Sequence, residues 1–292
     1  MYKIACIPVY DEESRIADIV KRTKKFVDEV VVCDDGSTDN TFLNAKSAGA
    51  IVIKHEKNLG KGEALRSIFD YVKNSNADLI VTIDGDGQFL PEEIPKLFAN
   101  IIEKKSDIVI GYRFDDETEM PSYRKFGNKV LDKMTNMASD LPLRDTQSGF
   151  RAYSKKAIDD ITFQSSGFGA DAEILIDASK KGLRISEEKI TVLYNTGGKT
   201  STKNPISHSA EVIISLIEII AIRRPLSYLG IPGVILTIVG IIFSVIVLST
   251  FNDTRYFSIP FTLIALGATF LGLLLLLMSV VLFSIKKSSK VN

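Results

Sequence analysis

Leu-Ile-Val-Thr-Ile-Asp-Gly-Asp-Gly-Gln, residues 79–88, joins an uninterrupted apolar run to two carboxylates. An apolar run of this kind predicts a β-strand that is buried on both faces, as in a parallel sheet. Asp84 and Asp86 follow directly, and ligands of open α/β sheets bind beyond the carboxyl ends of the strands. Two carboxylates with the amide of Gln88 suit a hard divalent cation that holds a phosphate-bearing ligand, whereas Asp-Gly pairs are also ordinary turn residues. This stretch alone leaves both interpretations open.

Segments with strand-like and helix-like patterns alternate on both sides of this stretch. Apolar runs predict further strands over residues 2–9, 29–33, 50–54, 107–111 and 183–193. Apolar residues at helical spacing predict helices that start near residue 12 and then cover 40–49, 63–73, 91–104, 123–138 and 171–181. This alternation predicts an α/β fold with a doubly wound, mostly parallel sheet. Polar residues follow three strands, at 8–12, 34–39 and 84–88, and we expect them to meet in one crevice.

Two long segments without charge lie in the last third of the chain. No charged residue occurs between Arg224 and Asp253, or between Arg255 and Lys286. A transmembrane helix needs roughly 20 apolar residues, so we predict two membrane spans joined by a short loop. Basic residues flank the outer ends of both spans, and the positive-inside rule places both termini and the large N-terminal domain in the cytoplasm. The sequence therefore predicts a multi-pass protein of the cell membrane or of an endoplasmic-type membrane.

The segment before the first span is amphipathic. Residues 206–222 carry apolar residues at helical spacing and lead directly to two arginines and Pro225, which predicts a helix on the bilayer surface. The predicted domains are a cytoplasmic domain over 1–205, an interfacial helix over 206–225, and a transmembrane hairpin with a basic tail over 226–292. Ala268 and Gly272 give the second span a face of small residues, which favours helix–helix contact and a homo-oligomer formed through the hairpin.

Composition and motif spacing exclude several classes of function. The formal net charge is zero, so nothing indicates a nucleic-acid-binding protein. Gly60-Lys61-Gly62 lacks the other residues of a P-loop, and residues 85–87 lack the third glycine of a dinucleotide fingerprint. The chain has two histidines, His55 and His208, and no cysteine pair at ligand spacing, which argues against a zinc site. We expect neither histidine to lie in the crevice, as a Ser-His-Asp hydrolase would require.

Four short motifs occur in a fixed order along the N-terminal half. They are Ile-Pro-Val-Tyr-Asp-Glu at 7–12, Asp-Asp-Gly-Ser-Thr-Asp at 34–39, Asn-Leu-Gly-Lys-Gly at 58–62 and Asp-Gly-Asp-Gly-Gln at 84–88. Each motif is short, but the ordered set resembles family 2 glycosyltransferases, which have the GT-A fold. Asp-Thr-Gln-Ser-Gly-Phe-Arg at 145–151 and the membrane hairpin are similar to the polyprenyl-phosphate (dolichyl-phosphate) glycosyltransferases of that family, dolichol-phosphate mannose synthase among them. The resemblance covers nearly the whole chain.

The resemblance implies a role for each matching position. The nucleotide-sugar donor would be bound by Pro8, Tyr10, Glu12, Asp35, Lys61, Asp84, Gly85, Arg113, Lys199 and Lys203. Mg²⁺ or Mn²⁺ on its diphosphate would be bound by Asp84, Asp86 and Gln88. The acceptor, a polyprenyl or dolichyl phosphate, would be bound by Arg124 and Lys125, and the catalytic residues would be Asp86 and Asp145. Many relatives carry an arginine where Asn195 falls, so the loop with the two lysines departs from the family pattern.

The implied reaction is an inverting transfer of a sugar from UDP-glucose, UDP-N-acetylglucosamine or GDP-mannose to the lipid phosphate. Its product would be a lipid-phosphate sugar for glycan assembly. The motifs do not select among these donors, and we favour a uridine donor. One alternative is a membrane scaffold that binds the nucleotide-sugar without turnover. A polysaccharide synthase is disfavoured because those enzymes carry Gln-x-x-Arg-Trp, whereas this chain has no tryptophan.

Several of these side chains also have a purely structural interpretation. Glu12 suits a first-turn helix acid, Asp35 suits turn chemistry, and Asp145 suits a structural hydrogen bond. Arg124 and Lys125 suit anionic lipid headgroups. The sequence leaves these alternatives open.

Overall fold

The structure is a computed structural model that describes residues 1–113, 122–163, 169–193 and 225–288. The chain forms two compact units, Met1–Leu216 and Ile217–Asn292. The interfacial helix predicted over 206–225 lies almost wholly outside the described residues, as does the loop that carries Lys199 and Lys203. The predicted limits of the three domains therefore remain predictions.

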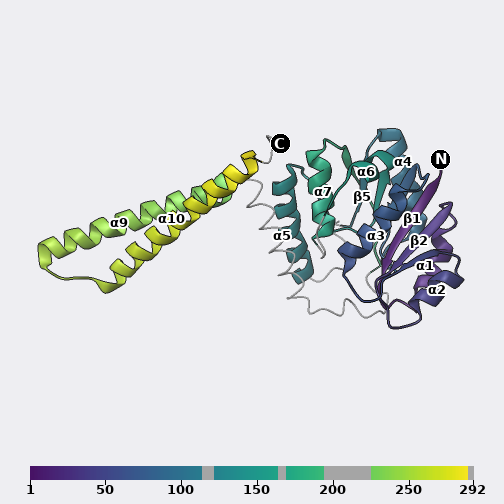
Figure 1. Cartoon of the computed structure of the whole chain (residues 1–292), viewed down its shortest axis with the longest axis horizontal. Coiled ribbons are helices and arrows are strands. Elements are labelled where there is room, and N and C mark those ends of the chain that lie inside the picture. The colour runs from purple at the N-terminus through teal and green to yellow at the C-terminus, as the bar shows by residue number, and fades with distance from the viewer. Residues whose placement is uncertain (114–121, 164–168, 194–224, 289–292) are drawn as a thin grey trace. The chain divides into compact units, whose positions relative to one another are not determined.

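A seven-stranded mixed sheet forms the centre of the N-terminal unit, with the strand order β3-β2-β1-β4-β6-β5-β7 (Figure 1). Its strands are β1 (Lys3–Val9), β2 (Glu29–Asp34), β3 (Ile51–Lys54), β4 (Leu79–Thr82), β5 (Ile108–Tyr112), β6 (Arg151–Ser154) and β7 (Ile185–Lys189). Among these strands only β6 runs antiparallel to its neighbours, β4 and β5, and the other pairs are parallel. The predicted α/β fold with a mostly parallel sheet is confirmed.

Helices cover both faces of the sheet, because successive side chains of each strand point to opposite faces. Along β1, Ile4 and Cys6 belong to one core cluster, whereas Ala5 and Ile7 belong to the other. The first cluster is covered by α3 (Lys61–Lys73), α6 (Lys155–Asp160) and α7 (Ala170–Lys180). The second is covered by α1 (Ile16–Thr23), α2 (Thr41–Ser47) and α4 (Ile94–Lys104), which follows the short 3-10 helix η1 (Pro91–Glu93). Helix α5 (Ser122–Ser139) packs against α7.

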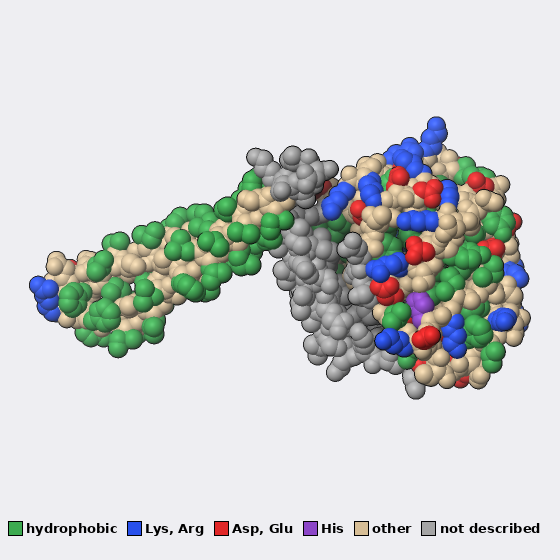
Figure 2. All heavy atoms as spheres, in the orientation of Figure 1, with side chains coloured by type: hydrophobic (Ala, Val, Ile, Leu, Met, Phe, Trp, Pro, Cys, Tyr) green, Lys and Arg blue, Asp and Glu red, His purple; other side chains and the backbone are tan. Residues whose placement is uncertain are grey.

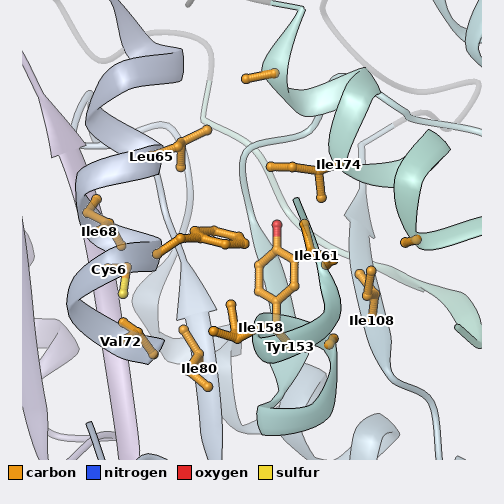
Figure 3. Close-up of a cluster of buried hydrophobic side chains, with 14 of the residues drawn as sticks. Cys6, Leu65, Ile68, Val72, Ile80, Ile108, Tyr153, Ile158, Ile161 and Ile174 are labelled. Atoms are coloured by element: carbon orange, nitrogen blue, oxygen red, sulfur yellow. The ribbon is translucent and has the colours of Figure 1, made fainter. Parts of the chain in front are cut away.

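Aromatic rings connect two segments of the predicted site through the first cluster (Figure 3). The ring of Phe69 on α3 meets the ring of Tyr153 on β6 edge to face, with the centroids 5.5 Å apart, and meets Phe163 at 5.3 Å. Such a pair adds roughly 0.5–1.5 kcal/mol beyond the burial of its area. The core therefore fixes α3, which begins at Lys61, relative to β6, which follows the loop with Asp145.

The structure adds β6, a strand that no sequence pattern predicted, and shifts two boundaries. Both partners of this four-residue strand lie far from it in the sequence, so no local signal marks it. The first helix begins at Ile16 instead of near residue 12, because Asp11 has a positive φ of 52° and residues 13–15 form a turn. The strand predicted over 183–193 is shorter in the structure, where β7 covers only Ile185–Lys189. Val192 forms an isolated bridge to Phe89.

The C-terminal unit is a helical hairpin of α9 (Ile231–Thr254) and α10 (Ile259–Ser288), preceded by the π-helical turn η2 (Leu226–Gly230). Leu226–Thr254 and Ile259–Ile285 are both long and apolar enough to cross a membrane. Their apolar side chains are largely exposed, and Figure 2 shows hydrophobic side chains along the hairpin. Water disfavours an apolar surface of this extent. The structure thus has the two apolar helices that the sequence predicts, and their orientation in a bilayer remains a prediction.

Glycines allow α9 and α10 to pack closely. A Cβ at Gly240 would lie 2.1 Å from Oγ1 of Thr269, and a Cβ at Gly272 would lie 2.4 Å from Oγ1 of Thr237. The small-residue face that was predicted to join two chains therefore packs, at Gly272, inside the hairpin of one chain. The predicted homo-oligomer gains no support from this position.

Gly240→Ala should destabilise the hairpin, because its methyl group would overlap Thr269 on the neighbouring helix. A Cβ at Gly267 would meet no atom within 4 Å. Gly267→Ala is therefore the matched control, and it should be neutral or stabilising by up to about 1 kcal/mol through helix propensity. Thermal unfolding of the full-length protein in detergent, followed by circular dichroism, would compare the two variants. Equal melting temperatures would contradict close packing at Gly240.

Candidate active site

Asp84 and Asp86 lie just beyond the carboxyl end of β4, near the centre of the sheet. Two glycines permit the close packing of this carboxylate turn. A Cβ at Gly85 would lie 2.2 Å from Cγ1 of Val9 on β1, and a Cβ at Gly149 would lie 2.3 Å from Oδ2 of Asp84. No side chain therefore fits at either position unless the turn moves. Gly149, just before β6, was not singled out from the sequence.

Basic side chains meet the carboxylates around this turn. Nζ of Lys61 lies 3.0 Å from Oδ1 of Asp84 and 3.0 Å from Oδ2 of Asp171, in the first turn of α7. Burial opposes the charge of Lys61, but the two carboxylates outweigh this effect and raise its pKa above the ordinary value. Arg113 forms a bidentate ion pair with Asp145. Its Nε donates to Oδ2 at 2.7 Å and its Nη2 donates to Oδ1 at 2.9 Å. Lys61 and Arg113 were both predicted to bind the nucleotide-sugar donor. The structure places each of them against acidic side chains.

Asp86 adds a second carboxylate to the oxygen ligands of the turn. Its Oδ1 accepts a hydrogen bond from the backbone N–H of Gln88 at 3.0 Å. Burial, followed by the charge of Asp84, raises the pKa of Asp86 above its ordinary value. Within the described part of the chain, no group of three or more His, Cys, Asp or Glu side chains is arranged to hold a metal ion. Asp84 and Asp86 therefore fit a hard cation whose remaining ligands come from a bound molecule or from water.

The loops that follow β1 and β2 are joined by hydrogen bonds, so two of the three polar strand ends do meet. The backbone N–H of Asp11 donates to Oγ of Ser37 at 2.9 Å, and Oδ1 of Asp11 accepts from the backbone N–H of Thr38 at 2.8 Å. The backbone N–H of Glu12 donates to Oγ1 of Thr41 at 2.8 Å. These bonds hold the first loop in the turn that delays the start of α1.

Three predicted nucleotide ligands, Pro8, Tyr10 and Glu12, lie on β1 and the loop after it. Pro8 is buried and Tyr10 is half-buried. Oε2 of Glu12 accepts a hydrogen bond from Nη1 of Arg15 at 2.8 Å. Burial raises the pKa of Glu12, and the charge of Asp86 acts in the same direction. The guanidinium of Arg15 opposes this rise in the pKa of Glu12.

Asp35, which follows β2, is tied to the loop before α3. Its carboxylate accepts hydrogen bonds from the backbone N–H groups of Leu59 at 3.0 Å and Gly60 at 2.7 Å. Nδ1 of His55 lies 2.7 Å from Oδ1 of Asp35, and Nε2 of His55 lies 2.9 Å from Oγ of Ser67. His55 therefore lies beside Asp35, one of the predicted nucleotide ligands, and the expectation that neither histidine serves a hydrolase remains a prediction. These contacts give Asp35 a clear structural role, and its contact with a nucleotide remains a prediction.

Two further carboxylates hold the loop that carries Asp145. Asp132 of α5 accepts hydrogen bonds from the backbone N–H and the hydroxyl of Thr146, both at 2.7 Å. Glu187 of β7 accepts one from the backbone N–H of Asp145 at 3.3 Å. Burial raises the pKa of Asp132 to about 7. Asp145 itself is fully buried, and both of its oxygens contact Arg113. This geometry suits a residue that orients Arg113, and the catalytic role of Asp145 remains a prediction.

Three acidic residues of the site were not predicted from the sequence, and four predicted side chains are not among those that the structure describes. Asp132, Asp171 and Glu187 belong to no recognised motif, and only their contacts across distant segments reveal them. Four predicted side chains lie outside the described ones, namely Arg124, Lys125, Lys199 and Lys203. The first two lie on α5. Lys199 and Lys203 follow Leu193 in the sequence. The backbone N–H of Leu193 donates to the carbonyl of Gln88 at 2.9 Å, so the last described residue before this loop lies beside the carboxylate turn.

Comparisons with known proteins show which family the chain resembles. The model of glycosyl transferase family 2 matches residues 4–162. The chain is 30% identical over 239 residues to Glycosyltransferase AglJ of Haloferax volcanii, with 80% of this chain and 77% of the relative covered. It is 33% identical over 211 residues to the UDP-N-acetylglucosamine–dolichyl-phosphate N-acetylglucosaminyltransferase of Methanococcus voltae, with 64% and 84% covered. Glucosyl-3-phosphoglycerate synthase from Mycobacterium tuberculosis, crystallised with Mn²⁺ and UDP-glucose, is similar in fold, with a TM-score of 0.61, 21% identity, and 75% of this chain and 79% of that chain covered.

Gly149→Ala should weaken the binding of Mn²⁺ in the presence of UDP by roughly tenfold or more, a loss typical of a displaced metal ligand. The added methyl group would occupy the space of the Asp84 carboxylate. Ser148→Ala, in the same loop, leaves that space free and serves as the control. Electron paramagnetic resonance of unbound Mn²⁺ would measure both affinities. An unchanged affinity in a folded Gly149→Ala protein would show that the position of Asp84 does not matter for the cation.

Proposed function

The chain belongs to glycosyl transferase family 2, and from this membership we propose that it transfers a sugar from a nucleotide-sugar to a polyprenyl or dolichyl phosphate. The observation that carries the proposal is the pair Asp84 and Asp86 at the end of the central strand β4, with Lys61 held against Asp84. Support for the acceptor comes from the Methanococcus voltae relative, whose name includes dolichyl phosphate. The two apolar helices would keep the domain at the bilayer in which such a lipid resides.

The donor diphosphate would bind at the carboxylate turn. Asp84, Asp86 and Gln88 would hold Mg²⁺ or Mn²⁺ through oxygen ligands, as both cations prefer. A cation bound there would stabilise the negative charge that develops on the departing nucleoside diphosphate. Lys61 and Arg113 supply further donors for phosphate oxygens, and the paired carboxylates of each fix its position. The loop with Lys199 and Lys203 would close over the donor, since it begins beside Gln88.

The acceptor phosphate needs little help from a base. The second pKa of a phosphate monoester is about 6, so the group is mostly anionic at neutral pH. Its oxygen forms the new bond to the anomeric carbon as the bond from that carbon to the diphosphate breaks, which inverts the anomeric centre in a single displacement. Arg124 and Lys125 of α5 would bind the phosphate. The full burial of Asp145 fits this reaction, because no proton has to be taken up by a carboxylate.

The position of the chain at the membrane follows from the same proposal. Both apolar helices would span the bilayer, and residues 206–225 would form the interfacial helix. The N-terminal domain and both termini would face the cytoplasm, where nucleotide-sugars are available and where the basic flanks of the spans belong. We favour a uridine donor, and the name of the Methanococcus voltae relative supports this choice.

A transfer assay of the purified full-length protein with a polyprenyl phosphate would test the proposed function. Radiolabelled UDP-glucose, UDP-N-acetylglucosamine and GDP-mannose would be compared, each with Mg²⁺, with Mn²⁺ and with a chelator. We expect label from a uridine donor to enter the lipid phase only when a divalent cation is present. Binding of a donor without transfer from any of the three would contradict the proposal and favour the scaffold.

Asp86→Asn should lower kcat/KM roughly a hundredfold or more in this assay, on the scale of losing a main electrostatic stabiliser. The substitution keeps the size of the side chain but removes the charge that a cation needs. Asp70→Asn, on the exposed side of α3, removes an equal charge outside the crevice and should leave the rate unchanged. Near-normal turnover by the Asp86 variant would contradict its role as a metal ligand.

A further inference from the structure

The carboxylate turn already holds a cation, the ammonium group of Lys61. Nζ of Lys61 lies 3.0 Å from Oδ1 of Asp84, so it neutralises a carboxylate that the proposed function assigns to a divalent cation. The same nitrogen lies 3.0 Å from Oδ2 of Asp171. Asp171 is 6% exposed, and the side chain of Lys61 is 18% exposed. An ammonium in such a site acts as a compact point charge that both carboxylates attract.

Acidic side chains around the turn already have basic partners. Asp145 forms an ion pair with Arg113, and Lys61 forms ion pairs with both Asp84 and Asp171. A cation that arrives alone competes with the ammonium of Lys61 for Asp84, and an ammonium that it displaces gains no new partner. A cation that arrives with a diphosphate brings phosphate oxygens, which accept hydrogen bonds from an ammonium.

Asp171 is the second carboxylate partner of Lys61 and stays available when a divalent cation binds Asp84. Its backbone carbonyl accepts a hydrogen bond from Nη1 of Arg151 at 2.9 Å, and its Oδ1 lies 3.7 Å from the same nitrogen. Arg151 is fully buried, so it holds Asp171 in a fixed position. Oδ2 of Asp171 can therefore retain Lys61 beside the site after Asp84 has released it.

We propose that Lys61 occupies Asp84 until a divalent cation arrives together with a diphosphate, and that Asp171 is the positioning residue that retains Lys61 during the exchange. This inference rests on the proposed function, since it requires a diphosphate ligand. Its consequence is that the cation and the nucleotide bind cooperatively, and by linkage each raises the affinity of the other by the same factor.

Equilibrium binding of Mn²⁺ to the full-length protein in detergent tests this exchange without any turnover. Unbound Mn²⁺ would be counted by electron paramagnetic resonance, with and without UDP. In the wild-type protein, UDP should raise the affinity for Mn²⁺ by about tenfold or more, within the usual range of coupling between two sites. Lys61→Met should bind Mn²⁺ more tightly than wild type when UDP is absent, and UDP should then raise the affinity by less than about threefold.

Asp171→Asn should change the affinity in the opposite direction. Lys61 would then have Asp84 as its one remaining carboxylate partner among those described, so Mn²⁺ should bind more weakly with and without UDP. If Asp171 acts through Lys61, the same substitution in a Lys61→Met background should change the affinity by less than about twofold. Asp177→Asn removes an equal charge on the same helix, away from Lys61, and is the matched control.

Two results would overturn the exchange while leaving the proposed function intact. One is a Lys61→Met protein whose affinity for Mn²⁺ without UDP equals that of wild type. The other is an equal effect of Asp171→Asn in both backgrounds. Lys61→Met leaves two carboxylates without their ammonium partner and can fail to fold, in which case the Lys61→Met/Asp171→Asn double variant, with one carboxylate fewer, carries the same test of reduced dependence on UDP. A wild-type protein that binds no Mn²⁺ even with UDP would overturn the proposed function together with the exchange.

Discussion

The acidic side chains beyond the end of β4 are partly or fully buried, and the basic side chains that meet them offset the cost of that burial, since an unpaired buried charge costs several kcal/mol. Lys61 lies between Asp84 and Asp171, and Arg113 is bound to Asp145. These side chains come from α3, the end of β4, α7, the residue after β5 and the loop before β6. The charge pairs therefore form only when sheet and helices have assembled, so the site depends on the whole N-terminal fold. The same pairs hold the basic groups that a diphosphate would need.

Sequence patterns predicted the parts of this arrangement that are local. The apolar run before Asp84 predicted a central strand, the motif at 58–62 contains Lys61, and the family resemblance indicated Arg113; both basic residues lie beside acidic groups. The parts that were not predicted depend on pairing between distant segments. Asp132 reaches Thr146 only because α5 lies against the loop before β6, and β6 itself exists only through pairing with β4 and β5. No pattern within a single segment carries that information.

Two predicted site residues, the nucleotide ligand Asp35 and the catalytic residue Asp145, make contacts within the protein that the sequence did not predict. The carboxylates of Asp35 and Asp145 both contact their own chain, the first at the loop before α3 and the second at Arg113. Parallel pairing of β2 with β3 places His55 beside Asp35, which explains why the spacing of the sequence did not reveal that contact. Asp35 therefore holds the backbone before α3, and Asp145 holds the guanidinium of Arg113. The roles of both positions towards a ligand remain predictions, and the packing shows which contacts each carboxylate already makes.

The position of Mn²⁺ in crystals of the full-length protein with UDP, located by anomalous scattering, tests the proposed site most directly. We predict one ion bound by both Asp84 and Asp86, with Nζ of Lys61 moved from Asp84 towards the diphosphate while it remains beside Asp171. An ion bound elsewhere in the N-terminal domain, or UDP bound away from the end of β4, would contradict the assignment of this crevice as the donor site.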